Sequence, residues 1–177
     1  MIIIINGPFG VGKTAVANEL LKRMPNSMRY DPEEVGFMLR NLIPACVREP
    51  SENTDDFQDL ELWRILTTQV AEEIVRKYRK TLIVPMTLWK RDYFDFIFNR
   101  FTQVATTFHF CLLAKKETVH QRLIERGDAV GSWPFLQTDK CLRSFSGFDF
   151  GEYIDTERTD ISGVCEIILN SIIKRRQ

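Results

Sequence analysis

The stretch "MIIIINGPFGVGKTAVANEL" (residues 1–20) decides the fold class. Its four consecutive isoleucines form an apolar, β-branched run, which is typical of a parallel strand buried on both faces. A glycine-rich turn comes next, and beyond it Val16 and Leu20 recur at helical spacing. The turn matches the pattern GxxxxGK[ST] from Gly7 to Thr14. A strand, a loop and a helix in this order predict the first βα unit of an α/β protein.

The remainder of the chain continues to alternate strand-like and helix-like segments. Further strands are predicted near 28–30, at 81–85, near 108–113 and near Tyr153, with helices between them. The longest predicted helix covers 57–78. We therefore expect an α/β three-layer sandwich whose central parallel sheet has about five strands and right-handed crossovers. The 177 residues are expected to form a single domain.

Composition excludes several classes of function. Lysine plus arginine equals aspartate plus glutamate, at 24 each, so the neutral chain gives no reason to expect nucleic acid as a partner. The four cysteines lie far apart without the spacing of a zinc site, which favours a reduced, cytoplasmic setting. The apolar start is too short for a signal peptide or a membrane span, so we expect no stable membrane insertion.

The glycine-rich turn predicts a phosphate-binding loop. Glycines let the backbone turn its N–H groups inward, and the helix after the loop adds its positive N-terminal end. Lys13 can reach the outer phosphates of a nucleotide, and the Thr14 hydroxyl can bind Mg²⁺. A plain strand-to-helix turn would need neither side chain. We expect ATP phosphates to contact Gly7, Gly10, Val11, Gly12, Lys13, Thr14 and Ala15.

The residues at the ends of the predicted strands indicate the type of phosphate chemistry. Switches and motors usually place an aspartate after a second buried strand, but the segment "LIVPMT" (82–87) has no carboxylate and the chain has no NKxD motif. These absences favour a small kinase. Asp31, after the predicted strand at 28–30, could accept the acceptor's proton or hold a water of Mg²⁺. It is also a good helix N-cap. Glu34 is a weaker candidate.

A lid is predicted over residues 122–145. Arg122 and Arg126 lie four apart on one helical face, where they could surround the negative charge of a transferring phosphoryl group. The alternative for both is a solvated helix face. Lys140 and Arg143 could close from the other side. Such a lid would exclude water from the reaction.

A cap for the acceptor is predicted over residues 32–78. Arg40, Trp63 and Arg64 could line the acceptor pocket, with Trp63 stacking on a planar or sugar group, and Thr87 could orient a water of the metal. A tryptophan on an apolar helix face is more often a core residue. His109 and His120 are expected to be structural.

Several stretches together resemble the tunicamycin-resistance ATP-binding proteins, a family of the P-loop kinase superfamily. They are "INGPFGVGKT", "YDPEEVGFMLR", "DFQDLELWR", "LIVPMT", "KETVHQRL" and the "SW" at 132–133. The resemblance implies a nucleotide-kinase-like fold, ATP with Mg²⁺, and resistance to a nucleoside antibiotic through phosphorylation. It supports the roles given above to Lys13, Thr14, Asp31, Arg40, Arg122 and Arg126.

Three functions are consistent with these patterns. The leading hypothesis is an ATP-dependent phosphotransferase that acts on a small-molecule acceptor. The second is an ATP-binding protein that sequesters a drug without modifying it, which would need the loop but no proton acceptor. The third is a housekeeping nucleoside or nucleotide kinase.

Overall fold

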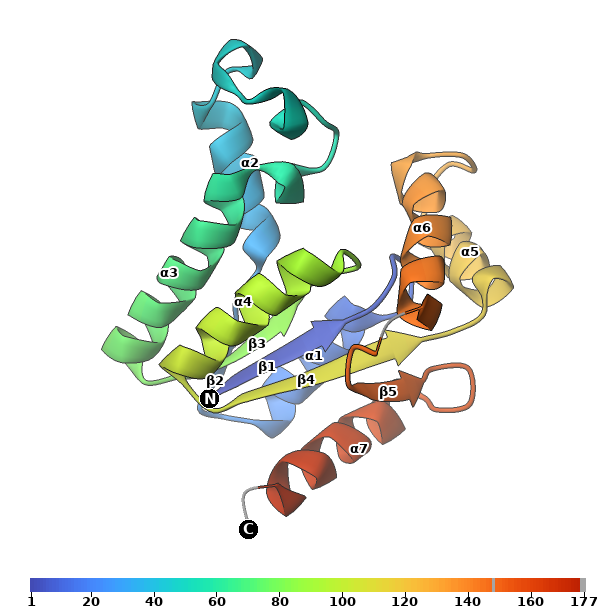
Figure 1. Ribbon diagram of the computed structural model, residues 1–177. Helices are drawn as coiled ribbons and strands as arrows, with labels where there is room; N and C mark the ends of the chain where they lie inside the picture. The colour runs from blue at the N-terminus through green and yellow to red at the C-terminus, as the bar shows by residue number, and fades with distance from the viewer. Residues whose placement is uncertain (148, 176–177) are drawn as a thin grey trace.

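A parallel sheet forms the centre of the computed structural model, which describes residues 1–147 and 149–175 (Figure 1). Within these residues it has five strands in the order β2–β3–β1–β4–β5, and every neighbouring pair is parallel. This confirms the predicted α/β class. The strands are β1 (Ile2–Asn6), β2 (Ser27–Arg29), β3 (Thr81–Pro85), β4 (Thr107–Leu113) and β5 (Glu152–Asp155).

Helices connect the strands and cover both faces of the sheet. They are α1 (Lys13–Arg23), α2 (Pro32–Leu42), α3 (Glu61–Tyr78), α4 (Arg91–Val104), α5 (Lys116–Glu125), α6 (Trp133–Gly147) and α7 (Ile161–Lys174). Between α2 and α3 lie three short 3₁₀ turns, η1 (Ala45–Val47), η2 (Pro50–Glu52) and η3 (Phe57–Asp59). Among the described helices, none combines the length and apolar character that crossing a membrane requires.

The predicted helix over 57–78 is interrupted at its start. The Asp56 carboxylate accepts a hydrogen bond from the Gln58 N–H (3.0 Å), and the Leu60 N–H donates to the Phe57 carbonyl (3.1 Å). These bonds close a 3₁₀ turn instead of a helical one. Leu60 is extended, with φ −65° and ψ 119°, and α3 begins only after it. The local side-chain bond of Asp56 thus outcompetes the helix at this end.

The isoleucines of β1 build two cores. Ile2 and Ile4 pack into the apolar cluster under α3 and α4, whereas Ile3 and Ile5 pack into the cluster with α1 and α7. All four side chains are fully buried. Successive side chains of a strand point to opposite faces, so one apolar run serves both layers.

The carboxyl ends of β1 and β3 are tied together by a buried asparagine. Asn6 Oδ1 accepts hydrogen bonds from the N–H groups of Gly7 and Leu88, both at 2.8 Å, and its Nδ2 donates to the Leu88 carbonyl (3.0 Å). The start of the glycine-rich loop is therefore held against the segment after β3. In open α/β sheets this edge is where ligands bind.

Candidate active site

The loop between β1 and α1 depends on glycine at three positions. Gly7, Gly10 and Gly12 have φ values of 142°, 80° and 104°, which L side chains rarely adopt. A Cβ on Gly7 would also lie 2.4 Å from the Leu112 carbonyl oxygen, and one on Gly10 would lie 2.9 Å from the Val119 carbonyl oxygen. The loop therefore packs directly on neighbouring backbone, as a phosphate-binding loop requires.

The beginning of α1 fits a phosphate group. Gly12 occupies the N-cap position, and among the described residues no side chain caps this end and no acidic residue lies in the first turn. The first N–H groups of a helix have no partner within the helix, and their dipoles favour an anion. Thr14 and Ala15 are exposed here. The residues present therefore match the predicted nucleotide site, with Thr14 as the hydroxyl available to a metal ion.

Lys13 lies at the same end of α1. Its Nζ donates to the carbonyls of Gly7 (3.0 Å) and Pro8 (2.8 Å) and lies 5.4 Å from the centre of the Phe9 ring. Burial lowers the pKa of Lys13 to about 8, because desolvation disfavours the charged form. The ammonium is still mainly protonated at pH 7, so a partly desolvated positive charge stands beside the loop.

A cavity of about 980 Å³ opens on the outer side of the loop. Its walls are Gly10 to Gly12, the end of α5 and the segment from Thr156 to Ser162 between β5 and α7. Arg122 holds this region together, since it donates to Thr156 Oγ1 (3.0 Å) and to the Thr156 carbonyl (2.8 Å). The position is suited to the nucleoside part of a nucleotide whose phosphates lie in the loop. We call this space the donor cavity.

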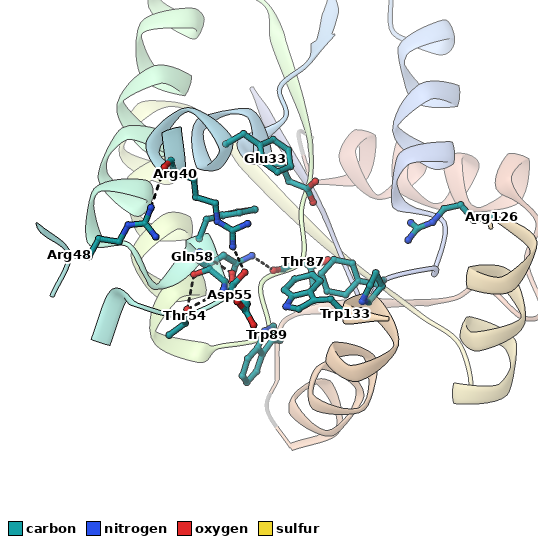
Figure 2. A pocket seen from close by; sticks show the side chains of 15 residues that line it. Glu33, Arg40, Arg48, Thr54, Asp55, Gln58, Thr87, Trp89, Arg126 and Trp133 are labelled. Carbon is teal, nitrogen blue, oxygen red and sulfur yellow. Dashed lines mark hydrogen bonds between the residues drawn. The ribbon is translucent and has the colours of Figure 1, made fainter. Parts of the chain in front are cut away.

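A second cavity, of about 800 Å³, lies on the other side of the loop. It is lined from α2, the segment between α2 and α3 that includes η3, the segment after β3 and the residues around the start of α6 (Figure 2). We call this space the acceptor cavity. Its walls combine charged and aromatic side chains, including Glu33, Phe37, Arg40, Arg48, Asp55, Asp56, Phe57, Trp89, Arg126 and Trp133.

The cap side of the acceptor cavity is held by close packing and backbone acceptors. A Cβ on Gly36 would lie 2.5 Å from the Phe57 ring, so only glycine lets η3 approach α2 this closely. Arg40 donates to the Asp55 carbonyl and lies 5.4 Å from the Phe57 ring centre. Arg48 donates to the Ile43 carbonyl at 2.7 and 3.0 Å.

The floor of the acceptor cavity contains buried polar groups. Gln58 Nε2 donates to the Thr87 carbonyl at 2.7 Å, which fixes the orientation of the carboxamide (Figure 2). Within the described residues, Gln58 Oε1 and Thr87 Oγ1 are buried without a hydrogen-bond partner. Buried polar atoms are costly to leave unpaired, which is more often tolerated at functional sites than elsewhere. Thr87, expected from the sequence to lie at this edge, does so.

Three of the predicted residues meet in the acceptor cavity and others do not. Arg40, Thr87 and Arg126 line it, and Arg126 also lines the donor cavity. Trp63 does not: it is 1% exposed, and its Nε1 donates to the Pro32 carbonyl (2.9 Å) in the core. Arg64 instead donates to the Gln58 carbonyl (2.8 Å) and covers the Tyr93 ring. The residues lining the two cavities include neither Lys140 nor Arg143.

The acidic residues at the start of α2 differ in what they contact, and the N-cap that the sequence predicted for Asp31 is present. Asp31 caps the helix, accepting from the Glu33 N–H at 3.1 Å, and is absent from the cavity lining. Glu33 and Glu34 are both exposed to solvent, but Glu34 is also absent from the cavity lining. Glu33 lines the acceptor cavity. Burial, followed by the charge of Asp31, raises the pKa of Glu33, while the charges of Lys13 and Arg126 oppose that rise.

Sequence reasoning missed several lining residues, among them Glu33, Arg48, Trp89 and Trp133. A helical periodicity in the sequence could have identified Glu33. Glu33, Phe37 and Arg40 are spaced by four and three, which places them on one face of α2, and all three line the cavity. No comparable periodicity marks Trp89, which lies after a strand, or Trp133, which begins a helix.

Comparison with solved structures shows the family of the chain. A tunicamycin resistance protein from Deinococcus radiodurans has a TM-score of 0.78 and 30% sequence identity, over 97% of this chain and 94% of that chain. The chain belongs to the family of that protein. No protein-family model and no curated protein sequence matched it. The family resemblance therefore rests on the shared structure and on the aligned residues.

More distant structures share the fold alone. A gluconokinase from Sinorhizobium meliloti 1021 has a TM-score of 0.62 at 16% identity, covering 93% of this chain and 86% of that chain. A shikimate kinase from Acinetobacter baumannii, in complex with shikimate, has a TM-score of 0.62 at 15% identity, covering 98% of this chain and 93% of that chain. These matches place the chain within the P-loop kinase fold.

Proposed function

We propose that the chain is an ATP-dependent small-molecule kinase of the tunicamycin-resistance type. The observation that carries the proposal is the position of Arg126, which lines both the donor cavity and the acceptor cavity. A guanidinium between a nucleotide and an acceptor is suited to the negative charge that develops during phosphoryl transfer. A protein that sequestered a drug would also need a second cavity, but it would not need a cation that lines both that cavity and the donor cavity.

The donor side would hold ATP through Gly7, Gly10, Val11, Gly12, Lys13, Thr14 and Ala15. Backbone N–H groups would contact the phosphates, Lys13 would neutralise the outer ones, and the Thr14 hydroxyl would bind Mg²⁺. When bound, ATP supplies the phosphoryl group and Mg²⁺ neutralises its charge. Arg122 is hydrogen-bonded to Thr156 and so would hold the wall of the donor cavity in place beside the loop.

The acceptor side favours a compound with a ring and hydroxyl groups. The cavity is lined by three acidic and three basic side chains, which are Glu33, Asp55, Asp56, Arg40, Arg48 and Arg126. Of the basic residues, Arg40 and Arg48 already donate hydrogen bonds to backbone carbonyls. The aromatic walls suit a planar or sugar face. A nucleoside antibiotic fits this description, and the name of the Deinococcus protein makes tunicamycin the first compound to test.

We infer further that residues 32–78 act as a cap and residues 122–145 as a lid. The two segments stand above the same end of the sheet, with the acceptor cavity lined from both (Figure 1). Closure over the acceptor would exclude water and direct the phosphoryl group to the acceptor's hydroxyl.

Mass spectrometry tests the proposal directly. The protein is incubated with Mg-ATP and, in separate reactions, with tunicamycin, deoxyadenosine, gluconate and shikimate, and the compounds are analysed for the gain of one phosphoryl group. We expect the gain on one acceptor with the wild type and none with Lys13→Met. Tight binding of tunicamycin with no gain of mass would favour sequestration. Transfer to deoxyadenosine alone would favour a nucleoside kinase.

A further inference from the structure

The geometry points to Glu33, and not Asp31, as the group that accepts the proton of the acceptor's hydroxyl. This inference rests on the proposed kinase activity and names a catalytic residue for it. Asp31 is the residue that the sequence favours for the role. The two carboxylates lie two residues apart at the start of α2, but only Glu33 lines the acceptor cavity.

Asp31 is occupied elsewhere. One carboxylate oxygen accepts the Glu33 N–H (3.1 Å), and the other lies 3.9 Å from the Arg29 guanidinium. The first contact is the usual N-cap interaction, which fixes the side chain against its own helix. A carboxylate held in this way serves the fold of α2 and does not face the acceptor.

Glu33 has the position that the reaction requires. Its carboxylate extends from the first turn of α2 toward the space surrounded by Thr87, Trp133 and Arg126 (Figure 2). Within the part of the chain that the structure describes, its carboxylate forms no salt bridge, whereas Arg126 is paired with Asp128 at 2.6 Å. The Glu33 carboxylate is therefore available to an acceptor in the cavity.

The proposed step conserves atoms and charge. The acceptor's hydroxyl oxygen forms a bond to the γ-phosphorus of the nucleotide, and the bond from that phosphorus to the bridging oxygen breaks, so that ADP leaves with the electron pair. The hydroxyl proton passes to a Glu33 Oε atom. Lys13 and Arg126 remain protonated and balance the charge that moves to the leaving oxygen.

The electrostatic surroundings match a base. Burial and Asp31 raise the pKa of Glu33, Glu34 on the same helix adds to the rise, and Lys13 and Arg126 on the facing elements limit it. A carboxylate with a raised pKa is a stronger proton acceptor, and the two cations favour its charged form. The rate is expected to fall with acid at a pH above the usual range for a glutamate.

Three variants and one spectroscopic measurement test the inference. Glu33→Gln should lower kcat by about 10²- to 10⁴-fold for the compound that the wild type phosphorylates, with the Kd of Mg-ATP unchanged. Asp31→Asn should change kcat by less than about threefold, because asparagine caps a helix as well as aspartate does. Glu33→Asp should recover part of the loss. In ¹³C NMR of labelled glutamate carboxyls, the signal that Glu33→Gln removes should titrate above the ordinary range.

Two outcomes would overturn the assignment. One is a wild-type rate in Glu33→Gln, or a larger loss in Asp31→Asn than in Glu33→Gln. The other is a Glu33 signal that titrates at an ordinary glutamate pKa. If the wild type itself phosphorylates none of the four compounds, the proposed function fails first and the role of Glu33 fails with it. Circular dichroism and thermal unfolding of each variant show whether α2 remains folded.

Discussion

The phosphate loop takes its functional atoms from one run, residues 7–15, whereas the acceptor cavity takes its walls from segments between Phe9 and Pro134. Under the proposed function the loop would act mainly through backbone N–H groups, so its requirements are glycine conformations and one lysine. The cavity acts through side chains whose directions depend on how α2, η3 and α6 pack. A binding site made of backbone groups is determined by a short segment of sequence. A binding site made of side chains from distant segments is determined by tertiary packing.

The largest expected effect comes from removing the one charged side chain of the loop. Lys13→Met should lower phosphoryl transfer by at least about 10³-fold, because the charge of the outer phosphates would lose its partner. The measurement is the rate of transfer to the acceptor identified by mass spectrometry. A variant that transfers at the wild-type rate would contradict the role given to the loop.

The same substitution should stabilise the fold. Because burial lowers the pKa of Lys13 from 10.5 to about 8, the folded protein carries a disfavoured charge below pH 8 that the unfolded chain carries in water. Lys13→Met should therefore raise the free energy of unfolding by about 1–3 kcal/mol at pH 7. The wild type regains this energy as the pH rises from 8 to 10.5, so the difference measured by denaturation should shrink over that range.

A pair of glycine substitutions should affect nucleotide binding and acceptor binding separately. Gly7→Ala would force a Cβ to within 2.4 Å of the Leu112 carbonyl and should abolish nucleotide binding. Gly36→Ala would press on the Phe57 ring and should cost about 1–3 kcal/mol of stability. It should weaken acceptor binding while leaving the Kd of Mg-ATP unchanged, as calorimetric titration would show.

The control for this pair is Gly147→Ala. A Cβ on Gly147, within α6, would meet nothing within 4 Å, so both affinities and the unfolding temperature should stay close to the wild type. Loss of nucleotide binding in Gly36→Ala would mean that the two halves are not independent.

A smaller effect is expected from the wall of the acceptor cavity. Trp89 lines that cavity and not the donor cavity. Trp89→Ala should raise the KM for the acceptor by about tenfold, corresponding to about 1.4 kcal/mol of lost aromatic contact, with the KM for ATP unchanged. Steady-state kinetics with each substrate varied in turn gives both values. Equal changes in the two KM values would argue against a separate acceptor site.

The smallest effect on stability at neutral pH is expected from a substitution of His109, a buried residue of the sheet. His109 is buried on β4 against the rings of Phe94 and Phe98, and burial lowers its pKa to about 4. Between pH 6.5 and 4 the unfolded chain binds a proton that the folded chain does not, so wild-type stability should fall as the pH is lowered. His109→Leu should abolish most of this loss and change little at pH 7. Urea midpoints at pH 7 and pH 5 provide the comparison.

Much of the fold could be predicted from local patterns. The apolar run of β1, the strand at 81–85 and the helical spacing after Gly12 each depend on neighbouring residues, and the five-stranded parallel sheet results from their alternation. The start of α3 could not be predicted in the same way, because the side-chain bond of Asp56 replaced the first helical turn with a 3₁₀ turn.

Local sequence patterns did not predict which side chains line the acceptor cavity. Asp31 precedes α2 with extended backbone (φ −106°, ψ 105°) and Glu33 lies in the first helical turn, so a choice between them depends on how the start of α2 lies against the sheet. Trp63 lies in the core and Trp89 lies at the cavity, although both are aromatic residues in apolar surroundings. The packing of η3 on Gly36 holds Phe57 against α2 at the wall of the acceptor cavity.

The sequence alone determined the α/β class and the glycine-rich loop pattern from which the nucleotide is proposed, because each depends on backbone conformation and periodicity within a short segment. The tertiary structure alone decided that Arg126 lines two cavities, that Glu33 lines the acceptor cavity and that Trp63 does not. These facts join residues that lie far apart along the chain, and only the packing of α2, η3 and α6 brings them together.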